Sequence, residues 1–214
     1  MIIKELQVGT LRTNCYIIAD ELTKECAIID PGDNALSISN VIEDNDLIVK
    51  YILLTHGHFD HIMALSKLRE KYKVDVIIHE DEAKYLKNPN FNLSAMMDIK
   101  PISIASYKSI KDNDEIQIGS LIVKAIKVPG HTEGSICYYI ESEDVLIAGD
   151  TLFNGGIGRC DLYGGDYFTL VNSIKTKLFT LPDKTIVYPG HGESTSIGYE
   201  KENNTQLNVE IGCN

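Results

Sequence analysis

Half of the six histidines in this sequence fall within six positions, in the run Thr-His-Gly-His-Phe-Asp-His at 55–61. In an extended segment His56 and His58 point to the same side, because side chains alternate with a period of two. Asp60 and His61 follow at an expected helix start, where Asp is also favoured as a cap. Imidazole nitrogens and carboxylate oxygens are ligands of Zn²⁺ and of other first-row metals. The run therefore predicts a metal site.

Three further candidate ligands stand where apolar segments end. His131 and His191 each follow a Pro-Gly turn, and Asp150 ends the run Ala148-Gly149-Asp150. Strand ends that converge on one edge are where α/β architectures build their sites. We therefore expect these three residues to lie beside the 55–61 run.

Together these residues predict a dinuclear centre, with His56, His58 and His131 on one metal and Asp60, His61 and His191 on the other. Asp150 has two carboxylate oxygens and is suited to bridge the pair. Two metals roughly 3.5–4 Å apart can share a hydroxide and clamp a carbonyl or phosphoryl oxygen as charge develops. The pattern favours a metal-dependent hydrolase.

The periodicity of apolar residues predicts the elements that position these ligands. Strands are expected at 2–8, 13–19, 25–30, 47–54, 74–78, 115–118, 121–128, 136–140, 145–147 and 185–188. Helices are expected at 35–43, from Asp60 through Leu68, and at 167–179. Residues 80–100 are expected to be helical or irregular, and the Gly-rich stretch 154–165 to be a loop. Strands precede helix in both halves, which predicts an α+β fold, the αβ/βα four-layer sandwich: two mixed sheets packed face to face with helices outside.

Composition narrows the class of protein further. The formal net charge of −11 argues against a nucleic-acid binder. The N-terminal segment lacks a signal-peptide core, and no apolar stretch reaches the roughly 18 residues of a membrane helix. We therefore expect a cytoplasmic protein that acts on a small molecule, with no nucleic-acid or membrane partner. The scattered cysteines, which form no CxxC pair, are expected to be core residues, with Cys160 as a candidate exposed thiol.

Four motifs together resemble the metallo-β-lactamase superfamily over essentially the whole chain: the run at 55–61, Pro-Gly-His-Thr at 129–132, Ala-Gly-Asp-Thr at 148–151 and Pro-Gly-His-Gly at 189–192. The longer motifs Pro-Gly-His-Thr-Glu-Gly-Ser, Gly-Asp-Thr-Leu-Phe and Ile-Gly-Arg-x-Asp-Leu-x-Gly-Gly-Asp (157–166) are similar to its glyoxalase II-like branch. The resemblance implies the metallo-β-lactamase fold and two divalent ions, zinc first, with iron and manganese as alternatives. It also implies hydrolysis of a hydroxyacylglutathione-type thioester by a bridging hydroxide that Asp60 orients.

The chain departs from the two-domain glyoxalase II in places that concern substrate choice. That enzyme binds glutathione through basic residues of a C-terminal helical domain, whereas Lys201 is the one lysine after His191 here. We expect residues 1–214 to form a single hydrolase domain of the short type. Arg159 is the candidate ligand of a substrate carboxylate, because its forked donors suit that group. Its alternative role is a structural ion pair with Asp161 or Asp166.

Three other functions are compatible with the same residues. A lactonase or other ester hydrolase would use the same metals. A persulfide dioxygenase would bind one iron through two histidines and an aspartate, leaving His61 and His191 without a metal. A non-enzymatic metal-binding protein would hold the ions through the same ligands without catalysing a reaction.

Overall fold

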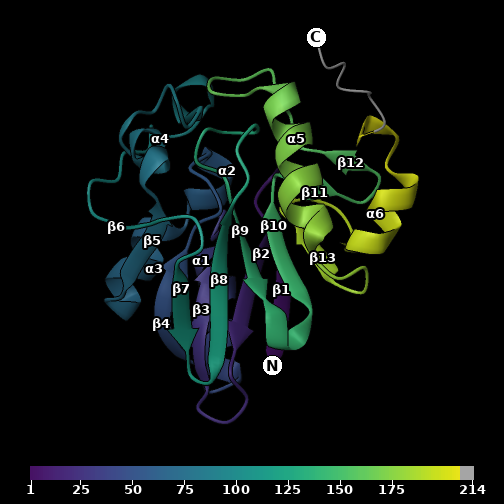
Figure 1. Ribbon diagram of the computed structural model, residues 1–214. Coiled ribbons are helices and arrows are strands. Elements are labelled where there is room, and N and C mark those ends of the chain that lie inside the picture. The colour runs from purple at the N-terminus through teal and green to yellow at the C-terminus, as the bar shows by residue number, and fades with distance from the viewer. Residues whose placement is uncertain (208–214) are drawn as a thin grey trace.

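The structure is a computed structural model that describes residues 1–207, and it is built around two six-stranded mixed sheets (Figure 1). The first sheet has the order β1-β2-β3-β4-β5-β6, antiparallel between β1, β2 and β3 and parallel from β3 to β6. Its strands are β1 Ile2–Val8, β2 Thr13–Ala19, β3 Glu25–Ile29, β4 Ile48–Leu53, β5 Asp75–His79 and β6 Lys108–Ile110.

The second sheet has the order β14-β13-β10-β9-β8-β7, and only β13 and β10 are parallel neighbours in it. Its strands are β7 Glu115–Ile118, β8 Leu121–Lys127, β9 Ile136–Ile140, β10 Val145–Gly149, β13 Ile186–Pro189 and β14 Thr195–Ser196. A small hairpin, β11 Leu152–Phe153 with β12 Gly156–Ile157, lies outside both sheets.

The helices cover the outer faces of the two sheets, α1 and α3 on the first and α5 and α6 on the second (Figure 1). The helices are α1 Ala35–Asp44, α2 Phe59–Ile62, α3 Leu65–Tyr72, α4 Ala83–Lys87, α5 Tyr167–Lys177 and α6 Ile197–Asn203. Short 3₁₀ turns are η1 Glu80–Glu82, η2 Ser94–Met96, η3 Glu141–Glu143, η4 Leu178–Thr180 and η5 Thr205–Leu207. In the described residues, no helix combines the length and apolar character needed to cross a membrane.

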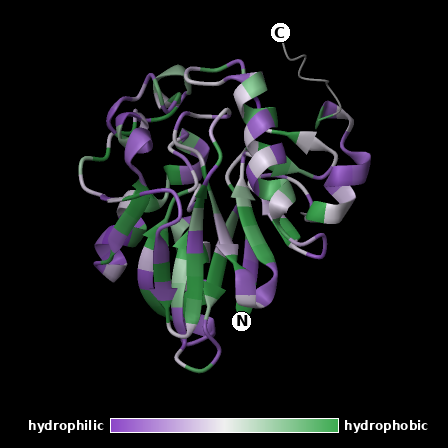
Figure 2. Cartoon of the chain, in the orientation of Figure 1, coloured by the Kyte–Doolittle hydropathy of each residue, from purple (hydrophilic) through white to green (hydrophobic). Residues whose placement is uncertain are grey.

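Alternation along the strands builds three apolar layers. In β2, Tyr16 and Ile18 face the second sheet, whereas Cys15 and Ile17 pack under α1 and α3. Figure 2 shows the resulting concentration of apolar residues along the strands of both sheets. On the far side of the second sheet, α5 contributes a third apolar cluster. The expected four-layer sandwich is confirmed. Strands that are buried on both faces stabilise it, because their apolar side chains are removed from water on each side.

Two local expectations are wrong, and three elements were not expected. The helix expected from Asp60 is interrupted, because the Ala64 N–H donates to the Pro31 carbonyl (3.0 Å) and α3 begins only at Leu65. The 154–165 stretch expected as a loop contains β12. Strand β6 was not predicted, nor were β14 and α6 after His191.

The cysteines mostly follow the expectation. Cys15, Cys26 and Cys137 are buried, and Cys213 lies outside the described residues. Cys160 is half-buried against the α5 cluster and its thiol donates to the Gly158 carbonyl (3.1 Å), so it is not the exposed thiol considered above. Burial raises its pKa to about 11, which keeps it a thiol near neutral pH.

Candidate metal centre

The candidate ligands converge on one edge of the sandwich, where several strands end. The 55–61 run follows β4, His131 follows β8, Asp150 follows β10 and His191 follows β13. Because β2 is antiparallel to β3, its first residues reach the same edge. The structure thus brings together all seven residues that the sequence singled out as metal ligands.

The first group consists of three buried imidazoles from two loops. His131 Nε2 lies 3.2 Å from His56 Nε2 and 3.0 Å from His58 Nδ1. Two nitrogens bound to one tetrahedral zinc at 2.0–2.1 Å would be about 3.3 Å apart. The three nitrogens therefore have the spacing of a shared metal.

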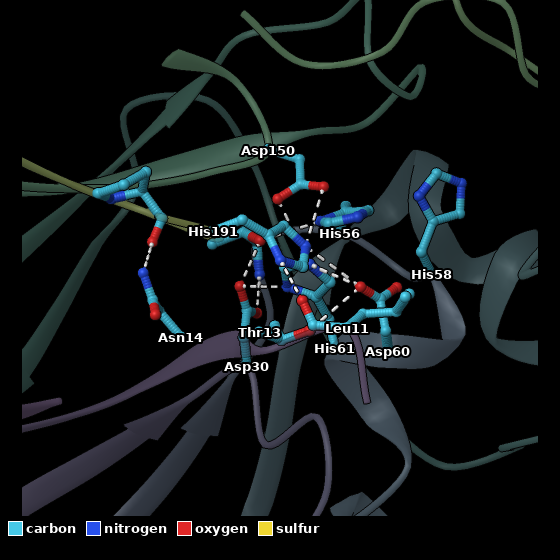
Figure 3. A network of polar contacts seen from close by, with 12 residues as sticks. Leu11, Thr13, Asn14, Asp30, His56, His58, Asp60, His61, Asp150 and His191 are labelled. Carbon is cyan, nitrogen blue, oxygen red and sulfur yellow. Dashed lines mark hydrogen bonds and ion pairs between the residues drawn. The ribbon is translucent and has the colours of Figure 1, made fainter. Parts of the chain in front are cut away.

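The second group consists of Asp60, His61 and His191 (Figure 3). Asp60 Oδ2 is 3.2 Å from His191 Nε2 and 3.7 Å from His61 Nε2. Asp60 lies in the first turn of α2 and His58 occupies the N-cap position without a side-chain bond, so the capping role considered for Asp60 is wrong. Its carboxylate faces the centre instead.

Asp150 faces both groups. Its Oδ1 lies 3.4 Å from His61 Nε2, and its Oδ2 lies 3.6 Å from His191 Nε2 (Figure 3). The same Oδ2 lies 3.8 Å from His131 Nε2. Both Asp150 Oδ1 and His61 Nε2 are buried without a hydrogen-bond partner among residues 1–207. Buried polar atoms rarely lack partners, because desolvation is then uncompensated. A cation between these two atoms would satisfy both, so the residues fit a metal.

The pKa shifts of the histidines agree with a bound cation between the two groups. Burial, and then the neighbouring imidazoles, hold the pKa of His56 well below its ordinary value, and the same causes lower the pKa of His58 to about 3. These rings are neutral, as metal ligands must be. Burial alone would lower the pKa of His61, but the carboxylates of Asp60 and Asp150 raise it well above the ordinary value. The surroundings of His61 therefore favour positive charge.

Most of the second ring nitrogens are hydrogen-bonded, which fixes the ring orientations. His131 Nδ1 lies 2.7 Å from the Arg159 carbonyl, and His191 Nδ1 lies 3.1 Å from the Leu11 carbonyl. Among the candidate ligands, His58 differs, because its Nε2 is buried without a partner in the described residues.

Asp30 belongs to the site although the sequence analysis missed it. Its Oδ2 lies 2.9 Å from His61 Nδ1 and accepts the Thr55 hydroxyl (2.6 Å), and its Oδ1 accepts the Thr55 N–H (2.8 Å). A carboxylate behind a histidine ligand fixes its tautomer and raises its basicity. The available signal was an Asp directly before Pro31-Gly32 at the end of β3.

The start of β2 supports the second group, which the sequence analysis also missed. The Thr13 hydroxyl donates to Asp60 Oδ2 (3.1 Å). The Asn14 amide donates to the carbonyls of Pro189 (3.1 Å) and Gly192 (2.9 Å), which flank His191. These bonds hold Asp60 and His191 against the sheet.

Arg159, Tyr163, Tyr188 and His79 do not join the two groups. The exposed Arg159 guanidinium pairs with Asp161, with Nη2 3.1 Å from Oδ2, so its backbone alone contacts the centre. The Tyr163 ring stacks on Phe91 at a centroid distance of 4.0 Å, and the Tyr188 ring packs edge-on against Tyr16 in the core. The His79 ring accepts the Asp81 N–H at the start of η1.

A fold of two mixed sheets with clustered histidines and aspartates at one edge defines a class of metal-binding proteins, and comparison identifies the family. The model of the metallo-beta-lactamase superfamily matches residues 8–191. The chain therefore belongs to the metallo-β-lactamase superfamily. It is 40% identical over 207 residues to a probable metallo-hydrolase, YqgX, of Bacillus subtilis, covering 96% of this chain and 97% of the relative. It is 36% identical over 214 residues to the hydroxyacylglutathione hydrolase GloC of Haemophilus influenzae, covering 97% and 99%.

Solved structures agree on the fold. A B3 metallo-beta-lactamase, BLEG-1, superimposes with a TM-score of 0.92 at 37% identity, covering 97% of this chain and all of that one. TTHA1623 in a di-iron-bound form gives 0.85 at 30% identity, covering 94% and 98%. ETHE1 from Myxococcus xanthus gives 0.81 at 32% identity, covering 97% and 84%. The chain is thus a metallo-hydrolase of this superfamily.

Proposed function

We propose that this protein is a dinuclear metal-dependent hydrolase that cleaves a thioester of the hydroxyacylglutathione type. The observation that carries the proposal is the Asp150 carboxylate, which faces both groups of candidate ligands at 3.4–3.8 Å. The first metal would be held by His56, His58 and His131 and the second by Asp60, His61 and His191, with Asp150 shared. Zinc is the proposed metal, and the di-iron form of TTHA1623 makes iron the first alternative. The likeness to GloC supports the thioester.

The bound metals would supply a nucleophile ionised near neutral pH and polarise the carbonyl oxygen of the substrate. Asp60 is the residue that we propose orients that nucleophile. The Thr13 hydroxyl occupies one side of its Oδ2, and His191 lies on another, so the carboxylate has a fixed direction. Pre-set geometry of this kind lowers the entropic part of the barrier.

The leaving group decides between substrate classes. A thiol with a pKa near 8.5 departs as a thiolate without a general acid, whereas an amide nitrogen needs a proton. The Tyr163 ring stacks on Phe91 and the Tyr188 ring packs against Tyr16, and in residues 1–207 neither hydroxyl is hydrogen-bonded to a candidate metal ligand. This arrangement favours the thioester over an amide such as a β-lactam.

A panel of substrates tests the proposed function. S-lactoylglutathione, a simple thioester, a lactone, a phosphodiester and a β-lactam are compared on the zinc-loaded protein. We expect turnover of the thioesters to exceed that of the other classes by about tenfold or more, which corresponds to a difference of about 1.4 kcal/mol in the barrier. Inert thioesters beside rapid turnover of the lactone or the β-lactam would contradict the proposal.

A mononuclear iron persulfide dioxygenase is the second candidate, and the likeness to ETHE1 at 32% identity is the observation that favours it. Such an enzyme would leave His61 and His191 without a metal. In this chain both lie with Asp60 in a complete second group, which favours the dinuclear hydrolase. Oxygen consumption with a glutathione persulfide, by protein that holds one iron per chain, would establish the dioxygenase instead.

Arg159 is proposed to bind a substrate carboxylate, in exchange for its pair with Asp161. Replacing Arg159 with alanine is expected to raise KM for S-lactoylglutathione about fivefold and leave kcat unchanged, since an exposed charge contributes weakly, and equally to the bound substrate and the transition state. The Asp161→Asn variant frees the guanidinium and should lower KM. Steady-state kinetics of wild type and both variants measure these KM values. Equal KM values in all three proteins would mean that Arg159 only forms a structural ion pair with Asp161.

A further inference from the structure

A buried carboxylate lies between the two loops that carry the first histidine group. Glu82 ends the turn η1 and has no exposed surface, at 0%. Its Oε2 accepts the Gly57 N–H and its Oε1 accepts the Gly134 N–H, both at 2.9 Å. Gly57 separates the two histidines at the start of the 55–61 run, and Gly134 lies shortly after His131. One side chain therefore bonds to both loops.

The two glycines are packed too closely for any side chain. A Cβ on Gly57 would lie 2.6 Å from the Tyr85 Cβ, and a Cβ on Gly134 would lie 2.9 Å from the Glu82 Cγ. Both loops therefore approach η1 and α4 at distances that glycine alone permits. The backbone of each loop therefore packs directly against η1 and α4, with no side chain of its own in between.

Burial of the Glu82 carboxylate is unfavourable unless hydrogen bonds compensate for the lost hydration. Burial raises the pKa of Glu82 to about 7, against hydrogen bonds from Thr132, Gly134 and Gly57 that lower it. No salt bridge to Glu82 is formed within residues 1–207. Glutamine has the same shape but only one acceptor oxygen, whereas the N–H groups of Gly57 and Gly134 both need an acceptor here. A carboxylate meets that requirement with both of its oxygens.

We propose that Glu82 is a positioning residue of the metal centre, which sets the separation of His131 from His56 and His58 by bonding to both loops. The second group depends on other contacts: Asp60 on Thr13, His61 on Asp30, and His191 on its Leu11 and Asn14 neighbours. Glu82 thus acts on one metal site selectively. This inference rests on the proposed metal site but not on the thioester substrate.

The test is a Zn²⁺ titration of metal-free protein against a colorimetric chelator, for wild type, Glu82→Gln and the control Glu80→Gln. Glu80 is the exposed neighbour in η1. In Glu82→Gln we expect one of two binding steps to weaken about 10- to 100-fold, as for other groups that orient metal ligands, with the other step within about twofold of wild type. Glu80→Gln should match wild type.

Selectivity distinguishes positioning from a general structural role. Two unchanged binding steps in Glu82→Gln would overturn the inference, and so would equal weakening of both steps with a lower melting temperature. If Glu82→Gln does not fold, Glu82→Asp replaces it, because the shorter side chain keeps the charge but cannot bond both loops at once. A wild type that binds two Zn²⁺ and hydrolyses no thioester would contradict the proposed function and leave this inference standing.

Discussion

Removal of divalent metals with a chelator is expected to lower thioester hydrolysis to below about one thousandth of its starting rate. Polarisation of the carbonyl by the metals contributes several kcal/mol, and each 1.4 kcal/mol is a factor of ten. The nearby side chains do not replace that contribution: His56, His58 and His131 are neutral, Asp150 is anionic, and the positive charge of protonated His61 is compensated by Asp60 and Asp150. Initial rates before dialysis, after dialysis and after addition of Zn²⁺ measure the effect.

The same treatment should change stability. Without a cation, the carboxylates of Asp60 and Asp150 lie together in a mostly buried site, and their charge is compensated there by protonated His61. Zn²⁺ at about 100 times its Kd should add about 2.7 kcal/mol of stability, which raises Tm by roughly 5–10 °C for a chain of this size. Full activity after exhaustive chelation, with an unchanged Tm, would contradict the metal site itself.

Replacing Asp60 with asparagine is expected to lower kcat about 10²–10⁴-fold, the usual range for a group that orients or activates the nucleophile. Asparagine keeps the shape, and its oxygen can accept the Thr13 hydroxyl as Asp60 Oδ2 does. Because Oδ2 also faces His191 (3.2 Å), that amide oxygen would offer the second metal a neutral ligand in place of a carboxylate, and the NH₂ at the Oδ1 position could not bind a cation. Steady-state kinetics and the metal content of the variant measure the two consequences.

Asp46→Asn is the matched control for Asp60→Asn. It removes the same charge from an exposed turn whose left-handed backbone, at φ 53°, suits asparagine equally. We expect its kcat and metal content to equal those of wild type. A kcat of Asp60→Asn within a few-fold of wild type would remove Asp60 from the catalytic role.

The sequence predicted the layers of this fold because its strands carry clear apolar patterns. Strands β1, β2 and β3 alternate or run apolar between turns, and they lie where they were expected. The short elements carried little periodicity: β14 has two residues, and so does each strand of the β11–β12 hairpin. The Asn154-Gly155 pair was the available signal for that hairpin, since such pairs favour tight β-turns.

The metal ligands could be predicted from residue types and spacing, but the groups that orient the ligands could not. Asp30 reaches His61 and Thr13 reaches Asp60 because β3 ends and β2 begins at the edge that carries the 55–61 run. Glu82 reaches two loops that are far apart along the chain. Such contacts depend on which elements become neighbours, and local pattern does not contain that information.

The most direct test of the dinuclear centre is the metal content of protein loaded with Zn²⁺ and desalted to remove loosely held ions. Elemental analysis against protein concentration should give two zinc ions per wild-type chain, since His56, His58, His131, Asp60, His61, His191 and Asp150 form two groups with a shared carboxylate. A value of one zinc per chain, or none, would contradict it.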